Sequence, residues 1–213
     1  MKNYKKNLQV LQEGYVYSKE MEHDACGVGL IASTDGKKYR KVVEYGINAL
    51  KAVWHRGAVD ADGKTGDGAG VHLEIPSDFF AEKIELTGHK HDGSEICVGM
   101  VFLPRNNYAA QENSRTLIES ELTKSNFSIY GWRQVPVNPK VLGEKANLTR
   151  PEITQVLFKH NDKNLKDKNL ERKIYESRRK IEKEAIKCAL DGFYICSLSS
   201  KSIIYKGMFL AES

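Results

Sequence analysis

The stretch MEHDACGVGLIAS (residues 21–33) places Cys26 at the edge of an apolar run, with polar residues ahead of it. A structural thiol usually behaves as a small buried hydrophobe inside such a run. A nucleophilic cysteine instead reacts as its thiolate and needs a base that lowers its pKa. An N-terminal cysteine supplies that base itself, because an α-amino group has a pKa of about 7.7–8.0. This chemistry requires removal of residues 1–25, and the small neighbours Ala25 and Gly27 leave the bond before Cys26 sterically open.

A second stretch, WHRGAVDADGKTGDGAG (residues 54–70), is rich in glycine and aspartate, which predicts a loop. It lacks the order of a P-loop, and its aspartates would repel a phosphate. The spacing of Asp60, Asp62 and Asp67 does not match an EF-hand calcium loop. Taken alone, the stretch is most typical of a tight surface turn.

Two further groups of residues offer binding chemistry, and each has a simpler interpretation. A metal set can be drawn from His23, Asp24, Cys26, His55 and His72, but the spacings fit no usual zinc pattern. A basic helix that could contact nucleic acid carries Arg172, Lys173, Arg178, Arg179 and Lys180. Glutamates at 171, 176, 182 and 184 interleave with these cations, which favours a solvated helix face. We therefore expect no metal site and no nucleic-acid partner.

The composition describes an ordinary globular chain of 213 residues, with 29% charged residues, 40% hydrophobic residues and a net charge of +5. The sequence contains no run of 18 apolar residues, so we expect no membrane-spanning segment. Polar residues interrupt the N-terminal segment where a secretory signal would be apolar. Cys26, Cys97, Cys188 and Cys196 lie far apart and form no C-x-x-C pair, which indicates reduced thiols in a cytoplasmic protein.

Hydrophobic periodicity predicts the elements that must position these residues. We expect a flexible leader over 1–25, and a loop over 57–70. The predicted helices cover 39–56, 77–86, 107–125 and 170–190. The predicted strands cover 27–33 (buried), 71–75 (half-buried), 95–104, 127–137 and 153–160, and residues 192–209 should form a hairpin of two strands around a Ser-Ser-Lys-Ser turn. Strands and helices mix without strict βαβ alternation, which favours an α+β fold.

Three blocks taken together, HDACGVGLIA, ALKAVWHRGAVDADGKTGDGAGVHLEIP and IIYKGM, closely resemble the glutaminase domain of glutamate synthase large subunits. These domains belong to the class II glutamine amidotransferases, which are N-terminal-nucleophile hydrolases. The order and spacing of the blocks match from residue 21 to residue 208. The T-G-D-G-A-G loop favours glutamate synthase over related amidotransferases, which share the Cys-Gly start and the H-R-G block.

The resemblance implies a propeptide over residues 1–25 and an amidotransferase domain over residues 26–213. Cys26 would be the catalytic nucleophile, attacking the side-chain amide of L-glutamine to release ammonia and form a γ-glutamyl thioester. Residues implied to support the nucleophile pocket are Gly27, His55, Arg56, Gly57, Gly66, Asp67 and Gly68. No metal is expected.

The resemblance also implies an αββα four-layer sandwich that is incomplete at its C-terminus. The family's H-S-R and N-G-E segments, which follow the YKGM block, do not occur in this sequence, and truncation should leave an apolar sheet edge unpaired. No cofactor is expected in this chain; FMN and an iron–sulfur cluster would lie in the rest of a complete synthase. That remainder, and possibly a small subunit, would be its partners. Two alternatives stay open: a non-catalytic truncated remnant that serves as an interaction module, and the glutaminase domain of another class II amidotransferase.

Overall fold

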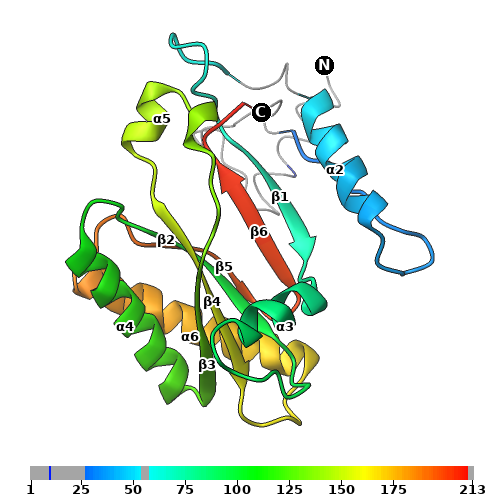
Figure 1. Ribbon diagram of the computed structural model, residues 1–213, viewed down its shortest axis with the longest axis vertical. Coiled ribbons are helices and arrows are strands. Elements are labelled where there is room, and N and C mark those ends of the chain that lie inside the picture. The colour runs from blue at the N-terminus through cyan, green and yellow to red at the C-terminus, as the bar shows by residue number, and fades with distance from the viewer. Residues whose placement is uncertain (1–9, 11–26, 54–57, 211–213) are drawn as a thin grey trace.

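The computed structural model describes residues 10, 27–53 and 58–210 of the chain (Figure 1). The helices are α2 (Arg40–Ala52), α3 (Ser77–Glu85), α4 (Tyr108–Lys124), the 3-10 turn η2 (Pro139–Val141), α5 (Glu144–Leu148) and α6 (Asp167–Lys187). The strands are β1 (Ala69–Glu74), β2 (Cys97–Leu103), β3 (Phe127–Gln134), β4 (Glu152–His160), β5 (Tyr194–Ser199) and β6 (Ser202–Gly207). The mixture of helices with antiparallel sheets confirms the predicted α+β class.

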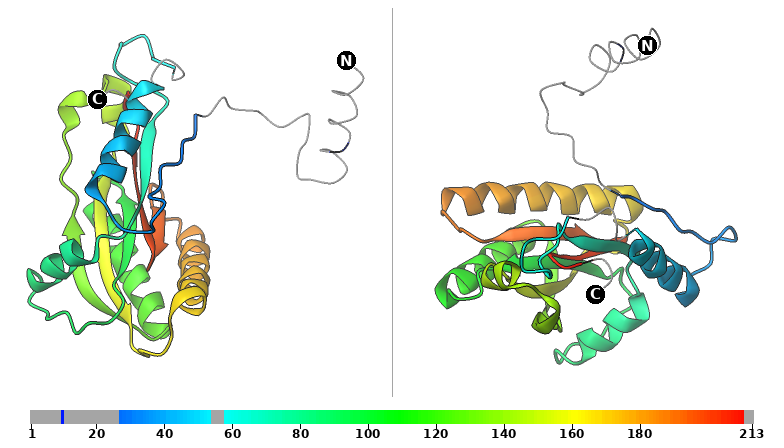
Figure 2. Two further views of the ribbon diagram at one scale, coloured as in Figure 1. Left: turned by 90° about the vertical axis from the view of Figure 1, so that its right-hand side faces the viewer. Right: turned by 90° about the horizontal axis from the view of Figure 1, so that it is seen from above.

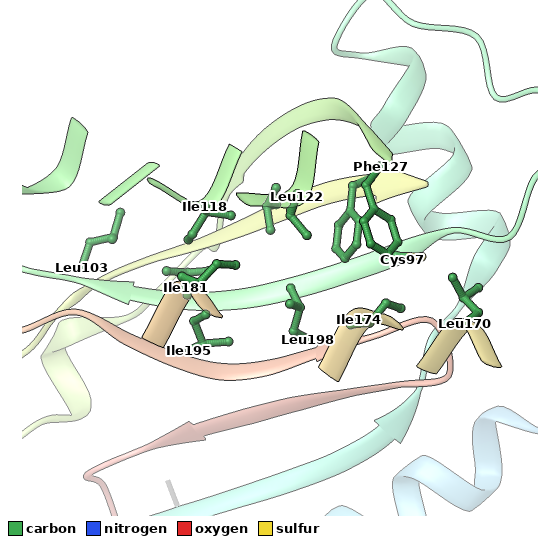
Figure 3. Packing of buried hydrophobic residues seen from close by; sticks show 13 residues of the cluster. Cys97, Leu103, Ile118, Leu122, Phe127, Leu170, Ile174, Ile181, Ile195 and Leu198 are labelled. Carbon is green, nitrogen blue, oxygen red and sulfur yellow. The ribbon is translucent and has the colours of Figure 1, made fainter. Parts of the chain in front are cut away.

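A four-stranded antiparallel sheet, in the order β3-β4-β2-β5, forms the centre of the fold. Both of its faces are buried, which explains why β2 reads as a continuous apolar run without polar alternation. On one face, Cys97, Val101 and Leu103 belong to a core cluster that α4 and α6 cover (Figure 3). On the other face, Val98 and Met100 belong to a second cluster.

That second cluster packs the central sheet against α3 and a two-stranded sheet made of β1 and β6. Phe80 and Ile84 of α3 and Ile203 of β6 are all fully buried within it. The alternation in β1, with Leu73 half-buried and His72 exposed, fits a strand that is covered on one side. Figure 2 shows the resulting layers, with α6 along one side of the sheets and α3 on the opposite side.

The predicted elements from residue 71 onward are confirmed, with ends that differ by at most three residues, but the predicted hairpin over 192–209 is wrong. Within the described residues, β5 pairs with β2, whereas β6 pairs with β1. Serine hydroxyls of β5 replace a hairpin ladder between the two strands. The Ile204 amide donates to Ser197 Oγ at 3.2 Å, and the Ser202 amide donates to Ser199 Oγ at 3.2 Å. The chain therefore passes from one sheet to the other at this turn.

The buried strand that the sequence predicts over 27–33 is not formed. Val28 and Leu30 are 94% and 92% exposed. A strand requires a hydrogen-bonded neighbour, and within the described residues none lies beside this segment. α2 confirms the helix predicted over 39–56 as far as Ala52, and none of its residues is buried. Residues 27–33 and helix α2 thus both leave apolar side chains in contact with solvent.

The leader predicted over 1–25 lies outside the described residues, apart from residue 10. In the part of the chain that the structure describes, no helix combines the length and the apolar character needed to cross a bilayer.

Candidate functional site

The predicted site residues fall into two groups. Cys26, His55, Arg56 and Gly57 lie outside the described residues, so the structure tests no contact of the nucleophile or of the H-R-G block. The described members are Gly27, Gly66, Asp67 and Gly68. Only these four residues can be placed relative to their neighbours.

Gly27, the residue after the nucleophile, lies beside the end of α2. A Cβ atom at Gly27 would be 3.8 Å from Val53 Cγ2. Five peptide links join Val53 to Ala58, so these residues are at most about 18 Å apart. Ala58 begins the segment that contains the other described site residues. The contact of Gly27 with Val53 therefore leaves Gly27 within reach of the glycine-rich segment.

Residues 58–68, here called the Gly-Asp loop, form a small closed hairpin rather than an irregular turn. Val59 and Gly66 make an isolated antiparallel bridge, and the Asp60 amide donates to the Thr65 carbonyl at 2.8 Å. Gly63 at its tip has a φ of +69°, a conformation that glycine adopts without steric cost. The surface turn predicted from composition is thus confirmed, with a defined internal structure.

Asp67 closes the base of the Gly-Asp loop. Its Oδ2 accepts a hydrogen bond from the Ala58 amide at 2.8 Å, and its own amide donates to the Ala58 carbonyl at 3.3 Å. A carboxylate in this position fixes the backbone amide of Ala58, the residue that follows the H-R-G block. The geometry gives Asp67 a structural role in the loop.

Gly66 and Gly68 bring the Gly-Asp loop against the end of β6. A Cβ atom at Gly66 would lie 3.1 Å from the carbonyl oxygen of Phe209, and one at Gly68 would lie 3.1 Å from that of Gly207. Gly68 also has a φ of +109°, which L side chains rarely adopt. The T-G-D-G-A-G block and the end of the IIYKGM block, far apart in the sequence, are therefore packed together.

The tip of the Gly-Asp loop is attached to α5 through Asp62. Asp62 Oδ1 accepts from the Thr65 amide at 2.7 Å, while Oδ2 accepts from Thr65 Oγ1 at 2.6 Å and from the Glu144 amide at 3.0 Å. These hydrogen bonds, those from Thr65 foremost, hold the pKa of the Asp62 carboxyl well below its ordinary value. Lys145 Nζ lies 2.6 Å from Asp60 Oδ2 and lowers the pKa of that carboxyl as well.

Sequence reasoning missed this attachment. Gly143 and Glu144 lie about eighty positions after Asp62, and no local pattern links them to the loop. The only local signal is the sequence Gly-Glu-Lys at residues 143–145, which is typical of a helix start because acidic residues favour the first turn of a helix.

Three cysteines lie within the described residues and form no disulfide. Cys97 and Cys196 are buried, and burial raises the pKa of both thiols.

In the described residues, no three His, Cys, Asp or Glu side chains converge where they could hold a metal. On α6, Arg172 pairs with Glu176 in an exposed position, which supports the interpretation of a solvated helix face there. Arg178 is half-buried instead, because it pairs with Glu182 and donates to the Ile195 carbonyl.

The family described as "Glutamine amidotransferases class-II" matches residues 26–213. This match, which covers most of the chain and agrees with the α+β fold, shows that the chain belongs to the class-II glutamine amidotransferases. The predicted similarity to glutamate synthase large subunits is also confirmed. The chain is 53% identical over 210 residues to the glutamate synthase (NADPH) large chain of Azospirillum brasilense, covering 99% of this chain and 14% of that protein.

Two further relatives have lower sequence identity to this chain. Identity is 41% over 188 residues to the ferredoxin-dependent glutamate synthase 2 of Synechocystis sp., covering 88% of this chain and 12% of that protein. Identity is 38% over 205 residues to the glutamate synthase (NADPH) large chain of Bacillus subtilis, covering 92% of this chain and 13% of that protein. The chain therefore spans about one eighth to one seventh of the length of these curated relatives.

Proposed function

We propose that this chain contains the glutaminase half-site of a glutamate synthase, with Cys26 as its nucleophile. The observation that supports this most directly is the packing of Gly27 beside Val53, which leads to the H-R-G block and the Gly-Asp loop. The family match over residues 26–213 begins at Cys26 itself, as a domain with an N-terminal nucleophile would.

The chemistry follows from an N-terminal cysteine. After removal of residues 1–25, the α-amino group of Cys26 accepts the thiol proton, and the thiolate attacks the side-chain amide carbon of L-glutamine. The carbon–nitrogen bond breaks, the nitrogen takes a proton, and ammonia leaves a γ-glutamyl thioester on Cys26. Water then attacks the thioester carbon, releasing glutamate and restoring the thiol. Gly27, His55, Arg56, Gly57, Gly66, Asp67 and Gly68 would shape the pocket.

The ammonia would serve the reductive amination of 2-oxoglutarate in the remainder of a synthase, which would be this chain's partner, with a small subunit where the electron donor requires one. FMN and an iron–sulfur cluster belong to that remainder. The described residues do not fit such a cluster, because Cys97, Cys188 and Cys196 do not converge. Free thiols in the described residues support a cytoplasmic location.

We further propose that the chain forms part of an αββα sandwich. The exposed Val28 and Leu30 would then be covered when residues 27–33 pair as a strand next to β1 and β6. The same exposed segment favours a second candidate function, a non-catalytic module that binds a partner through this surface.

Two mass measurements test the proposal. The intact mass of the purified protein shows whether residues 1–25 have been removed. The processed chain is then treated with the glutamine-like electrophile diazo-oxo-norleucine, with and without excess L-glutamine, and a Cys26→Ala variant serves as the control. We expect an adduct at Cys26 that glutamine suppresses. A folded, processed chain that forms no adduct would contradict the glutaminase and favour the interaction module.

A further inference from the structure

We propose that the joint between the Gly-Asp loop and α5, formed by Asp62, Thr65, Gly143 and the Glu144 amide, positions the glutamine pocket from outside it. The proposal rests on the proposed function and adds positioning residues to it. All four residues lie in the loop or at the start of α5, so their effect would act through the loop.

The joint is a specific contact between segments that are distant in sequence. Asp62 accepts from both the Thr65 side chain and the Glu144 amide, so one carboxylate fixes the loop tip and the first turn of α5 together. The Glu144 amide is among the helix donors that no helix carbonyl can satisfy. The loop thus supplies the partner that α5 needs, and α5 orders the loop.

Gly143 makes this close approach possible. It is buried, and a Cβ atom there would lie 2.1 Å from Thr65 Oγ1, 2.2 Å from Asp62 Oδ2 and 2.5 Å from the Thr65 backbone nitrogen. Any side chain at position 143 must therefore push the loop away from α5. Ala146 of α5 is 4% exposed, so α5 is itself packed against the molecule and part of the displacement would fall on the loop.

A displacement at the tip would be transmitted to the predicted pocket. Thr65 is 6% exposed and directly precedes Gly66 and Asp67, and the Val59–Gly66 bridge couples the two sides of the hairpin. Figure 1 shows α5 and the loop at the same end of the molecule, where β6 also ends. By contrast, the ion pair between Asp60 and the exposed Lys145 should contribute little to holding the loop against α5, because solvent-exposed ion pairs are weak.

The test compares two reactions of Cys26 in the full processed chain. Diazo-oxo-norleucine must be held as glutamine is, whereas iodoacetamide needs only an accessible thiolate, and peptide mass spectrometry measures each rate at Cys26. For Gly143→Ala and Thr65→Val we expect labelling by diazo-oxo-norleucine to slow about 10–100-fold, since small misplacements have effects of this size. Labelling by iodoacetamide should stay within about twofold of the wild-type rate.

Matched controls separate positioning from general damage. Thr65→Ser keeps the hydroxyl and should restore the wild-type rate. Gly46→Ala adds the same methyl group where no atom beyond its own stretch of helix lies within 4 Å, and it should have no effect on either labelling rate. If Gly143→Ala does not fold, as judged by thermal unfolding, Thr65→Val still tests the proposal.

The outcomes separate the proposed glutaminase function from the positioning role of the joint. Unlabelled wild-type protein would overturn the proposed function itself. Labelled wild-type protein, with Thr65→Val reacting at the same rate, would overturn the positioning role alone. A parallel loss of both labelling reactions would also contradict it, because that result indicates a lost thiolate or fold rather than a displaced pocket.

Discussion

Asp67 and Ala58 are joined by two hydrogen bonds, one from the Ala58 amide to Asp67 Oδ2 at 2.8 Å and one from the Asp67 amide to the Ala58 carbonyl at 3.3 Å. This pair closes the Gly-Asp loop immediately after the H-R-G block. One oxygen of the carboxylate in the T-G-D-G-A-G segment thus accepts a backbone hydrogen bond. We therefore predict that Asp67 supports the pocket by fixing the chain at Ala58.

Replacing Asp67 tests this assignment. Asp67→Ala removes the acceptor and leaves the Ala58 amide without its side-chain partner, so we expect faster hydrogen exchange in peptides that contain residue 58 and slower labelling of Cys26 by diazo-oxo-norleucine. Asp67→Asn retains an oxygen that can accept the same bond, so its effect should be smaller. An equal loss in both variants would indicate that the negative charge itself matters.

Gly70 tests the contact between β1 and β6. A Cβ atom there would lie 2.7 Å from the Tyr205 carbonyl oxygen, so Gly70→Ala must separate the two strands. We expect urea unfolding to show a loss of about 1–3 kcal/mol, the usual size for overpacking. In Gly46→Ala, a helix interior gains alanine without a clash, and stability should rise by up to about 1 kcal/mol. Equal stability of the two variants would contradict the close approach.

Sequence periodicity predicted the helices and strands from residue 71 onward because one face or both faces of each element are buried in the cores. Ile174 and Ile181, for example, recur at helical spacing and are fully buried. Which strands pair with one another was harder to predict. The turn between β5 and β6 has a hairpin pattern, yet β6 pairs with β1, which is about 130 residues earlier, and local spacing carries no information on that choice.

Two other features lay beyond local patterns. Residues 27–33 have the apolar character of a strand, but a strand also needs a partner, and within the described residues they have none. The joint of Gly143 with Asp62 depends on a tertiary approach between segments that have no periodicity. Motif order indicated the family and the Gly-Asp loop, whereas the residues that hold the loop in place required the structure.

The thiols should differ sharply in reactivity. Burial raises the pKa of Cys97 and Cys196, whereas Cys188 is exposed at the end of α6. Because the thiolate is the reactive form, we expect iodoacetamide at pH 8 to modify Cys188 and to leave the two buried thiols intact until the protein is unfolded. Peptide mapping of native and denatured protein measures this. Modification of Cys97 in the native protein would contradict the packing of β2.

Asp92 should make stability depend on pH. Lys159 Nζ lies 2.8 Å from its Oδ2, and this contact is the main reason that the pKa of Asp92 lies below its ordinary value of 3.8. A lowered carboxyl pKa contributes stability that is fully present above the ordinary pKa and is lost as the pH falls below it. The difference in urea midpoint between wild type and Asp92→Asn should be constant above about pH 5 and shrink below pH 3.8. A difference that did not change with pH would exclude a charge effect.

The passage of the chain from β5 to β6 depends on Glu171 of α6. Its Oε2 accepts from Ser199 Oγ at 2.9 Å and its Oε1 from the Ser200 amide at 2.6 Å, so one carboxylate holds the turn that links the two sheets. Glu171→Ala leaves a buried turn without its acceptor and should cost about 1–3 kcal/mol in urea unfolding. Glu176→Ala, on the same helix, removes only an exposed pair with Arg172 and should cost about 0.3–0.5 kcal/mol. If both variants lost the same stability, helix propensity and not the turn would explain the result, and the route between the sheets would not depend on this contact.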